Sequence, residues 1–302
     1  MATATRVVLR KSFLQREGVQ GWLLASPWII GFLVFTAFPL VFSFGLVFTD
    51  WDLFGTPEFV GLENIDRFIS DNRAHNAFIV TTKYAVCAVS LNIVIGLGIA
   101  VLLNQNVPLA GIMRAVYFLP SILPAASIAI IWRWIFSGDY GLLNWLLSLI
   151  GVMGPNWVHS RQYALVAVII IYVWQLGNTI LLFISGLQNI PGEVLEAAEV
   201  DGAGAWKRFT RITIPLLSPV ILFNLIIGII NSLQVFTVVV FMTGGGPRNS
   251  TEVIMLYLYN NAFRSFRMGY ASTLAWALFL YILVLTMVAM RWSKSWVYYG
   301  GE

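Results

Sequence analysis

The residues of this chain that could do chemistry fall into two sets, and the first is a charged segment, Glu193–Pro219, between two long uncharged runs. Its acids come first and its bases second: Glu193, Glu196, Glu199 and Asp201, then Lys207, Arg208 and Arg211. An amphipathic segment between apolar runs is suited to contact a protein in water. We therefore predict that it receives force from a separate motor protein. The alternative is a solvated connection between two helices on which nothing docks.

The second set consists of uncharged polar side chains inside the apolar runs. These side chains are Asn92, Gln175, Asn178, Asn224, Asn231, Ser232, Gln234 and Thr237. Amides can bond the hydroxyls of a sugar, and the neighbouring rings of Trp174 and Phe236 can cover its apolar faces. Asn231, Gln234 and Thr237 are spaced by three residues, which would place them on one face of a helix.

We predict that these three residues, together with Gln175 and Asn178, contact a solute. The alternative is that each amide bonds one helix to another, where such a bond contributes about 0.6–2 kcal/mol. The apolar runs hold almost no ionisable groups, and this disfavours ion-coupled carriers and voltage sensors, which carry acids or arginines inside the membrane. An anionic solute is disfavoured for the same reason, with Arg133 as the exception.

The sequence lacks the patterns of catalytic and cofactor-binding sites. None of its four lysines follows a Gly-x4-Gly pattern, so the chain has no phosphate-binding loop with which to hydrolyse ATP. His75 and His159 are isolated, and no cluster of Cys, His and Asp has metal-ligand spacing. We expect neither enzyme activity nor a bound metal or cofactor.

The composition is that of a membrane protein. Of the 302 residues, 59% are hydrophobic and only 11% are charged, whereas a soluble domain has about 25% charged residues. The twelve Trp and eleven Tyr suit two membrane–water interfaces. The net charge of +4 is spread along the chain, without the dense basic patch that nucleic-acid binding needs. We expect an all-α integral membrane protein, in which the single cysteine, Cys87, forms no intrachain disulfide.

The uncharged gaps that reach the length of a membrane-spanning helix, about 20 residues, predict six spans. They are expected near residues 22–48, 79–103, 113–136, 163–186, 213–241 and 270–290. A further apolar segment, 140–153, is too short to span and is better suited to an interfacial helix. Several spans contain prolines, which favours a bundle around a pathway, because neighbouring helices or water must satisfy the freed carbonyls.

The charges beside the first span set the predicted orientation. Four bases precede this span, and Asp50, Asp52, Glu58 and Glu63 follow it with no base before Arg67, which places the N-terminus in the cytoplasm. Six spans then return the C-terminus and the Glu193–Pro219 segment to the same side. The loop Met242–Gly269 fits poorly on the outer side, since it has three arginines and one acid, Glu252. The predicted parts are a cytoplasmic segment 1–21, a transmembrane domain 22–290 and a cytoplasmic tail 291–302.

Within the charged segment, the residue types predict two short helices. Pro191 can open the first, because its missing N–H is not needed in a first turn. Asp201-Gly202 would end it, with Gly202 in the left-handed conformation that often follows a helix. A second helix would start near Ala205 and end with the bases, since positive charge stabilises a helix C-terminus.

The charged segment also resembles a known motif. Glu196-Ala197-Ala198, three residues, Gly202, nine residues, Ile212, one residue and Ile214-Pro215 is similar to the EAA motif of ABC importer permeases, EAA-x3-G-x9-I-x-L-P. The single departure, Ile214 in place of Leu, is conservative. In that family the segment forms coupling helices that sit in a groove of a separate ATPase subunit. The resemblance implies that Glu196, Ala197, Ala198 and Gly202 form this contact, within a coupling loop 187–212.

The resemblance extends over roughly residues 20–295 and includes Met242–Pro247 and Gly269–Ser272. These flanking matches are similar to the carbohydrate-importer permeases, the group that contains the maltose permease. The predicted solute residues of the fifth span also lie where the maltose permease holds its sugar. Unlike that protein, this chain is expected to lack additional N-terminal helices and a large insertion in its outer loops, so that it resembles the short form.

The expected function is that of a six-helix permease subunit of an ATP-driven importer for a neutral sugar or oligosaccharide, in the cytoplasmic membrane of a prokaryote. The resemblance implies three partners: a second permease, an ATPase dimer and an extracytoplasmic solute-binding protein. Two alternatives stay open, a solute of the glycerol-phosphate type and a non-transporting membrane scaffold. A third, an ion-coupled secondary carrier, would transport without any ATPase partner.

Overall fold

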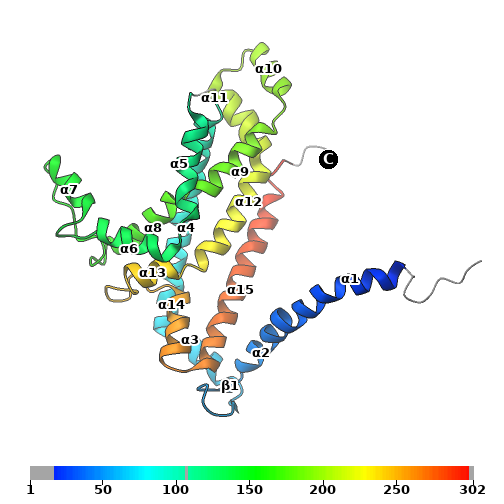
Figure 1. The fold of residues 1–302 in the computed structure, drawn as a ribbon, viewed down its shortest axis with the longest axis vertical. Helices are drawn as coiled ribbons and strands as arrows, with labels where there is room; N and C mark the ends of the chain where they lie inside the picture. The colour runs from blue at the N-terminus through cyan, green and yellow to red at the C-terminus, as the bar shows by residue number, and fades with distance from the viewer. Residues whose placement is uncertain (1–16, 106–107, 299–302) are drawn as a thin grey trace, which may run out of the picture.

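The structure, a computed structural model, describes residues 17–105 and 108–298 (Figure 1). Within these ranges the ordered segments are helices, apart from one antiparallel pair of short strands, β1 (Thr49–Asp50) and β2 (Glu58–Phe59). The all-α fold class is therefore confirmed. The four bases that precede the first span lie outside the described residues, as do the outer ends of the predicted terminal segments.

The helices range from single turns to long rods. The first half of the chain forms α1 (Glu17–Phe32), η2 (Leu33–Ala37), α2 (Phe38–Leu46), α3 (Glu63–Ser70), α4 (Asn72–Leu103), α5 (Ala110–Ile122), α6 (Ala125–Ile135) and α7 (Leu142–Leu149). The second half forms α8 (Ala164–Trp174), α9 (Gly177–Gln188), α10 (Gly192–Val200), α11 (Ala205–Arg208), η3 (Phe209–Thr213), α12 (Ile214–Leu233), α13 (Thr237–Met242), α14 (Ile254–Tyr259), η4 (Asn260–Arg264) and α15 (Met268–Ser293). In Figure 1, α10 and α11 lie at one end of the bundle, and β1 and α3 lie at the other.

Several helical runs are long and apolar enough to cross a membrane. Four do so alone: Gln20–Leu46, Asn72–Leu103, Ala205–Leu233 and Met268–Ser293. Two bent pairs, α5 with α6 and α8 with α9, pass the same test together, so the described residues hold four spans, or six if each pair is one span. The bent pairs lie where spans were predicted near 113–136 and 163–186. The run predicted near 213–241 begins at Ala205 and ends at Leu233.

Proline accounts for the sharpest bend and for two π-helical turns. The axes of α5 and α6 meet at 100° at Leu123-Pro124, and Leu123 is extended because the residue before a proline avoids helical geometry. Pro39 and Pro215 instead follow the π turns η2 and η3, and the helix continues through them. Since proline has no N–H to donate, the neighbouring bonds reach one residue further back.

Helix α4 lies at the centre of the bundle and packs against α8, α9 and α12. Four alanines along it, Ala74, Ala77, Ala88 and Ala100, are completely buried. Small side chains let membrane helices approach closely, and dispersion then holds them together where no hydrophobic effect acts between helices. Tight packing around α4 therefore assembles the bundle, and polar contacts occur only at particular positions within it.

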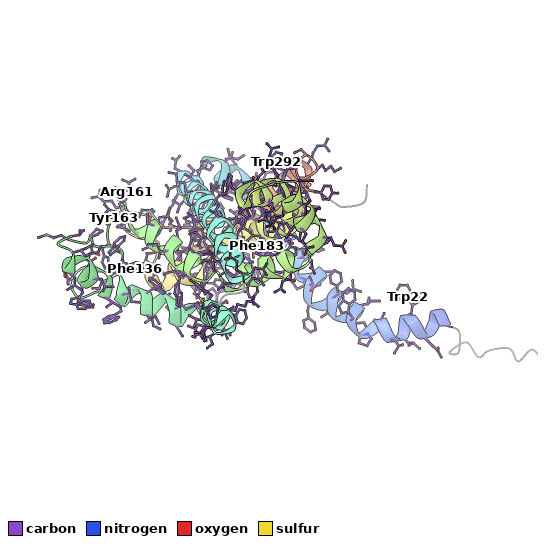
Figure 2. All side chains as sticks on the ribbon, turned by 90° about the horizontal axis from the view of Figure 1, so that it is seen from above. Trp22, Phe136, Arg161, Tyr163, Phe183 and Trp292 are labelled. Atoms are coloured by element: carbon purple, nitrogen blue, oxygen red, sulfur yellow. The ribbon has the colours of Figure 1, made fainter. Side chains whose placement is uncertain are left out.

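The first span leaves this bundle. Figure 1 shows α1 and α2 extending away from the other helices, and Figure 2 shows Trp22 on the opposite side of the molecule from Phe136 and Arg161. The end of α2 contacts α15, where Trp276 Nε1 donates to Ser43 Oγ at 3.2 Å. Most apolar side chains of α1 and α2 are exposed. Such a surface requires cover by lipid or by another protein chain.

A polar cluster joins the helix ends on the side opposite α10. Asp71 accepts hydrogen bonds from the backbone N–H groups of Arg73 and Ala74 at the start of α4. It also accepts bonds from the hydroxyls of Tyr257 in α14 and Tyr270 in α15. One carboxylate thus ties three helices together.

A second carboxylate fixes the loop Met242–Gly269 to α4. Glu252 is 2% exposed and accepts two bonds of 2.7 Å from the Arg73 guanidinium. The arginines of this loop, Arg248, Arg264 and Arg267, are exposed. The single acid of the loop is therefore buried and neutralised by α4, and the exposed charge of the loop is basic.

The Asp71 cluster predicts a loss of stability in acid. Burial would raise the pKa of Asp71, but the hydrogen bonds from Tyr257, Tyr270 and the backbone outweigh it and hold the pKa below its ordinary value of 3.8. The carboxylate therefore contributes stability above about pH 4, and this contribution is lost as the pH falls through the lowered pKa. Asp71→Asn, which can still cap α4, should lower the melting temperature at pH 7 and flatten its decline below about pH 4. An unchanged acid profile in thermal melts of the variant would contradict this role.

Candidate coupling segment and solute path

The turn after α10 has the geometry that its sequence predicts. Gly202 has a φ of +76°, and its N–H donates to Glu199 O at 3.0 Å. The N–H of Ala203 donates to Ala198 O at 2.9 Å. These two bonds together form a Schellman motif, which satisfies the last carbonyls of the helix and reverses the chain. The turn is left-handed, a conformation that glycine adopts without the steric cost of a Cβ.

The second half of the charged segment is continuous with a span. The helix that begins at Ala205 does not end with the bases but passes through η3 into α12. Arg208 of α11 forms an ion pair with Glu199 of α10 across the turn. A displacement of α10 can therefore pass through this turn to a helical run that extends to Leu233.

The four predicted coupling residues lie together at this tip of the molecule. Glu196, Ala197 and Gly202 are exposed, and Ala198 is buried. Two neighbouring apolar side chains are also exposed: Val200 is 89% exposed and Trp206 is 75% exposed. Charge, small residues and bare apolar groups on one protruding turn make a surface suited to a protein partner.

Two adjoining cavities lie deeper in the bundle, near the breaks between α5 and α6, α8 and α9, and α12 and α13. The larger, about 240 Å³, has these polar lining residues: Asn92, Ser121, Tyr172, Gln175, Asn178, Thr179, Asn224 and Asn231. The smaller, about 210 Å³, has these: Tyr84, Tyr172, Gln175, Asn231 and Thr237. Tyr172, Gln175 and Asn231 line both. Among the described residues, no charged side chain lines either cavity.

The hydrogen bonds divide the amides into two kinds. Asn92 accepts a bond from Thr179 at 2.7 Å, and Asn224 donates to Val220 O in its own helix. Asn92 thus joins α4 to α9, the helix-bonding role that was the alternative to solute contact, whereas Asn224 is bonded within α12. Asn178 and Asn231 are exposed to the cavity, and neither side chain bonds another described residue. Their free amides are available to a solute.

Gln234 does not join this group. Helix α12 ends at Leu233, so the regular spacing that was expected to align Asn231, Gln234 and Thr237 is interrupted. Gln234 instead lines a separate, apolar groove of about 610 Å³ between α12, α14 and α15. The structure therefore brings together Gln175, Asn178, Asn231 and Thr237, and it places Gln234 elsewhere.

The sequence also matches a known family. The family model described as "Binding-protein-dependent transport system inner membrane component" covers residues 92–295, which include the coupling segment and most of the lining of both cavities. The chain belongs to this family. It is accordingly a multi-pass permease of the inner membrane, with its predicted resemblance to the carbohydrate importers confirmed by its relatives.

Named relatives are similar over nearly the whole permease. The trehalose/maltose transport system permease protein MalF of Thermococcus litoralis is 34% identical over 91% of this chain and 94% of its own length. The lactose transport system permease protein LacF of Rhizobium radiobacter is 33% identical over 95% and 97%. The probable ABC transporter permease protein YesP of Bacillus subtilis is 38% identical over 96% and 95%.

A solved structure has the same fold. A chain of a bacterial ABC transporter involved in the import of the acidic polysaccharide alginate matches with a TM-score of 0.81 over 94% of this chain and 99% of its own. Its sequence identity is 22%, so the match speaks for the fold alone.

Two aromatic residues that line the cavities were not predicted from the sequence. Tyr172 lines both cavities, and Tyr84 lines the smaller one, with the two rings 6.0 Å apart. A spacing signal existed for Tyr172, which lies three residues before Gln175 and so on the same helical face. Tyr84 comes from α4, and only packing between distant segments brings it to the site. In the described residues no group of three or more His, Cys, Asp and Glu could hold a metal.

Proposed function

We propose that this permease moves a neutral sugar or oligosaccharide along the two cavities, with Gln175, Asn178, Asn231 and Thr237 as hydrogen-bonding contacts. The observation that carries the proposal is a path that, in the described part of the chain, is lined by amides, of which those of Asn178 and Asn231 are free, by tyrosine rings and by no charged side chain. Sugars offer hydroxyls and apolar ring faces to such groups. Relatives named for the transport of lactose or of trehalose and maltose support this solute class.

The energy for transport is proposed to come from a separate ATPase dimer that contacts Glu196, Ala197, Ala198 and Gly202. The protruding turn between α10 and α11 supports this contact, as does the continuity of α11 with α12. This role places α10, and with it both termini, on the cytoplasmic side. The outer side then carries β1, α3 and the loop Met242–Gly269.

Two further partners complete the proposed importer. The bare first span supports a second permease subunit, because an apolar helix that leaves its own bundle has a surface for another chain. A solute-binding protein would deliver the sugar to the outer side. A solved structural neighbour is a bacterial alginate ABC transporter in complex with an alginate pentasaccharide-bound periplasmic protein, and this supports the arrangement.

Asn231→Leu tests the path. The loss of one hydrogen bond of about 0.5–1.5 kcal/mol should raise the half-saturation concentration for sugar uptake about twofold to tenfold. Gln234→Leu, three residues away in another groove, is the matched variant and should have the smaller effect. Uptake of labelled sugars and of an anionic sugar is measured in vesicles that contain the complete transporter. A non-transporting scaffold would show no change in either variant, and a preference for the anionic solute would overturn the neutral class.

A further inference from the structure

Helix α7 has an apolar stripe that no described part of the chain covers. It lies on the arm formed by α6 and α8, away from α10 and α11 (Figure 1), on the side where Figure 2 labels Phe136 and Arg161. The exposed apolar side chains have the spacing of one helical face, and they are Leu142, Trp145, Leu146 and Leu149. The stripe continues beyond the helix through Ile150 to Met153, which is 99% exposed.

The loop around α7 holds this helix in place without a partner. Asn144 Nδ2 lies within hydrogen-bond distance of the carbonyl oxygens of Gly138, Gly154 and Pro155, at 2.9, 3.3 and 3.1 Å. Its Oδ1 accepts a bond of 2.8 Å from Trp157 Nε1. The side-chain amide of Asn144 thus holds the two ends of the loop together and fixes α7, and the apolar stripe faces outward.

The length of α7 and the absence of charged residues around it indicate what covers the stripe. Between Asp139 and Arg161 the sequence contains no Asp, Glu, Lys or Arg. An eight-residue helix is about 12 Å long, whereas the hydrocarbon core is about 30 Å thick, so α7 cannot span it. Tyr140 and Trp145 are the residue types that gather at membrane–water interfaces.

We propose that α7 and the turn 150–153 lie in a membrane–water interface, with the stripe in lipid. The apolar side chains Ile130, Ile131 and Trp134 of α6 are also exposed, so the lipid that covers α6 continues onto α7. A protein partner is disfavoured, because Asp139 is the single charged residue among those that share a groove with Leu142, Trp145 and Met153. The helix then acts as an interfacial anchor for the α6–α8 arm, whichever solute the permease carries.

Spin labels can place the stripe relative to the membrane. In a Cys87→Ser background, Leu149→Cys and Met153→Cys carry a nitroxide at the stripe, and His159→Cys carries one at an exposed polar position as the control. The full-length permease with its co-purifying subunits is reconstituted in lipid bilayers. Accessibility to oxygen, which concentrates in lipid, and to a water-soluble nickel chelate is then measured by electron paramagnetic resonance.

Labels at 149 and 153 should be several-fold more accessible to oxygen than to the chelate, and the label at 159 should show the reverse. Chelate access at 149 and 153 equal to that at 159 would overturn the proposal. Protection of both labels from both reagents would also overturn it, since another protein would then cover the stripe. Sugar uptake measured on the same samples separates this result from the proposed function, because lipid contact and transport can fail independently.

Discussion

Replacing Gly269 with alanine is expected to prevent stable assembly of the end of this permease that carries β1 and α3. A Cβ at this position would lie 1.8 Å from the backbone oxygen of Thr49 and 3.0 Å from the side-chain nitrogen of Asn64. Neither can retreat, because Asn64 donates to that oxygen at 2.9 Å and the adjacent Met268 N–H donates to Trp51 O at 2.9 Å. We expect a cost of about 4 kcal/mol or more, at the upper end of what single substitutions cause. Monodisperse protein after detergent extraction and its melting temperature are the readouts.

Gly98→Ala is the matched control for this variant. Gly98 lies within α4, and an added Cβ there meets nothing within 4 Å. Alanine is favoured over glycine by about 1 kcal/mol in a helix, so the control should be neutral or slightly stabilising. If Gly269→Ala is extracted and melts like the parent protein, the close contact between α15 and β1 is not what holds this end together.

The membrane segments could be predicted because charge is excluded from hydrocarbon, so uncharged gaps mark the spans. Their bends could not, because proline has different outcomes in different places. Leu123-Pro124 breaks the helix between α5 and α6, whereas Pro219 lies inside α12 without a break. Whether the freed carbonyl finds another partner depends on the neighbouring helices, and a single segment does not contain that information.

The coupling turn and the solute path differ in how well the sequence predicts them, and the reason is the same. Gly202 was predictable because a helix cap is a local structure with its own residue preference. The break after Leu233 was not, since residues 234–236 include no glycine or proline. Helix α13 turns there because Val239 and Met242 are buried in a cluster with residues of α6 and α8. Tertiary packing thus overrides the helical spacing that would have aligned Gln234 with Asn231.

The loop Met242–Gly269 shows that the charges in a sequence do not by themselves give the charge of the exposed surface. Its composition predicts a basic loop that fits poorly on the outer side, but it does not reveal that Glu252 is buried in the protein. The partner of this acid, Arg73, is 179 residues away in the sequence. Removal of Arg73, which is half exposed, would be costly, because it would leave the buried charge of Glu252 without a counter-charge. Counting residues therefore underestimates how basic the exposed side of this loop is.

Replacing Gly202 with valine is expected to uncouple this permease from the proposed ATPase without removing it from the membrane. Gly202 has a φ of +76°, and a Cβ added there would meet nothing within 4 Å, so the penalty is one of backbone conformation. A β-branched residue strongly disfavours this region, at a cost of about 1–2 kcal/mol. The turn should open and lose the bond from Ala203 to Ala198. Because about 1.4 kcal/mol corresponds to a factor of ten, uptake should fall by about that factor.

Gly204→Ala, two residues away, is the matched control, because Gly204 has a φ of −63° that alanine adopts freely. Glu196→Gln tests the charge of the same surface without changing the shape of α10. Uptake and binding-protein-stimulated ATP hydrolysis should both fall in Gly202→Val and Glu196→Gln, while Gly204→Ala keeps both. Normal uptake and normal stimulated hydrolysis in the first two variants would mean that the turn between α10 and α11 does not transmit the ATPase motion. The continuity of α11 with α12 would then have a structural role only.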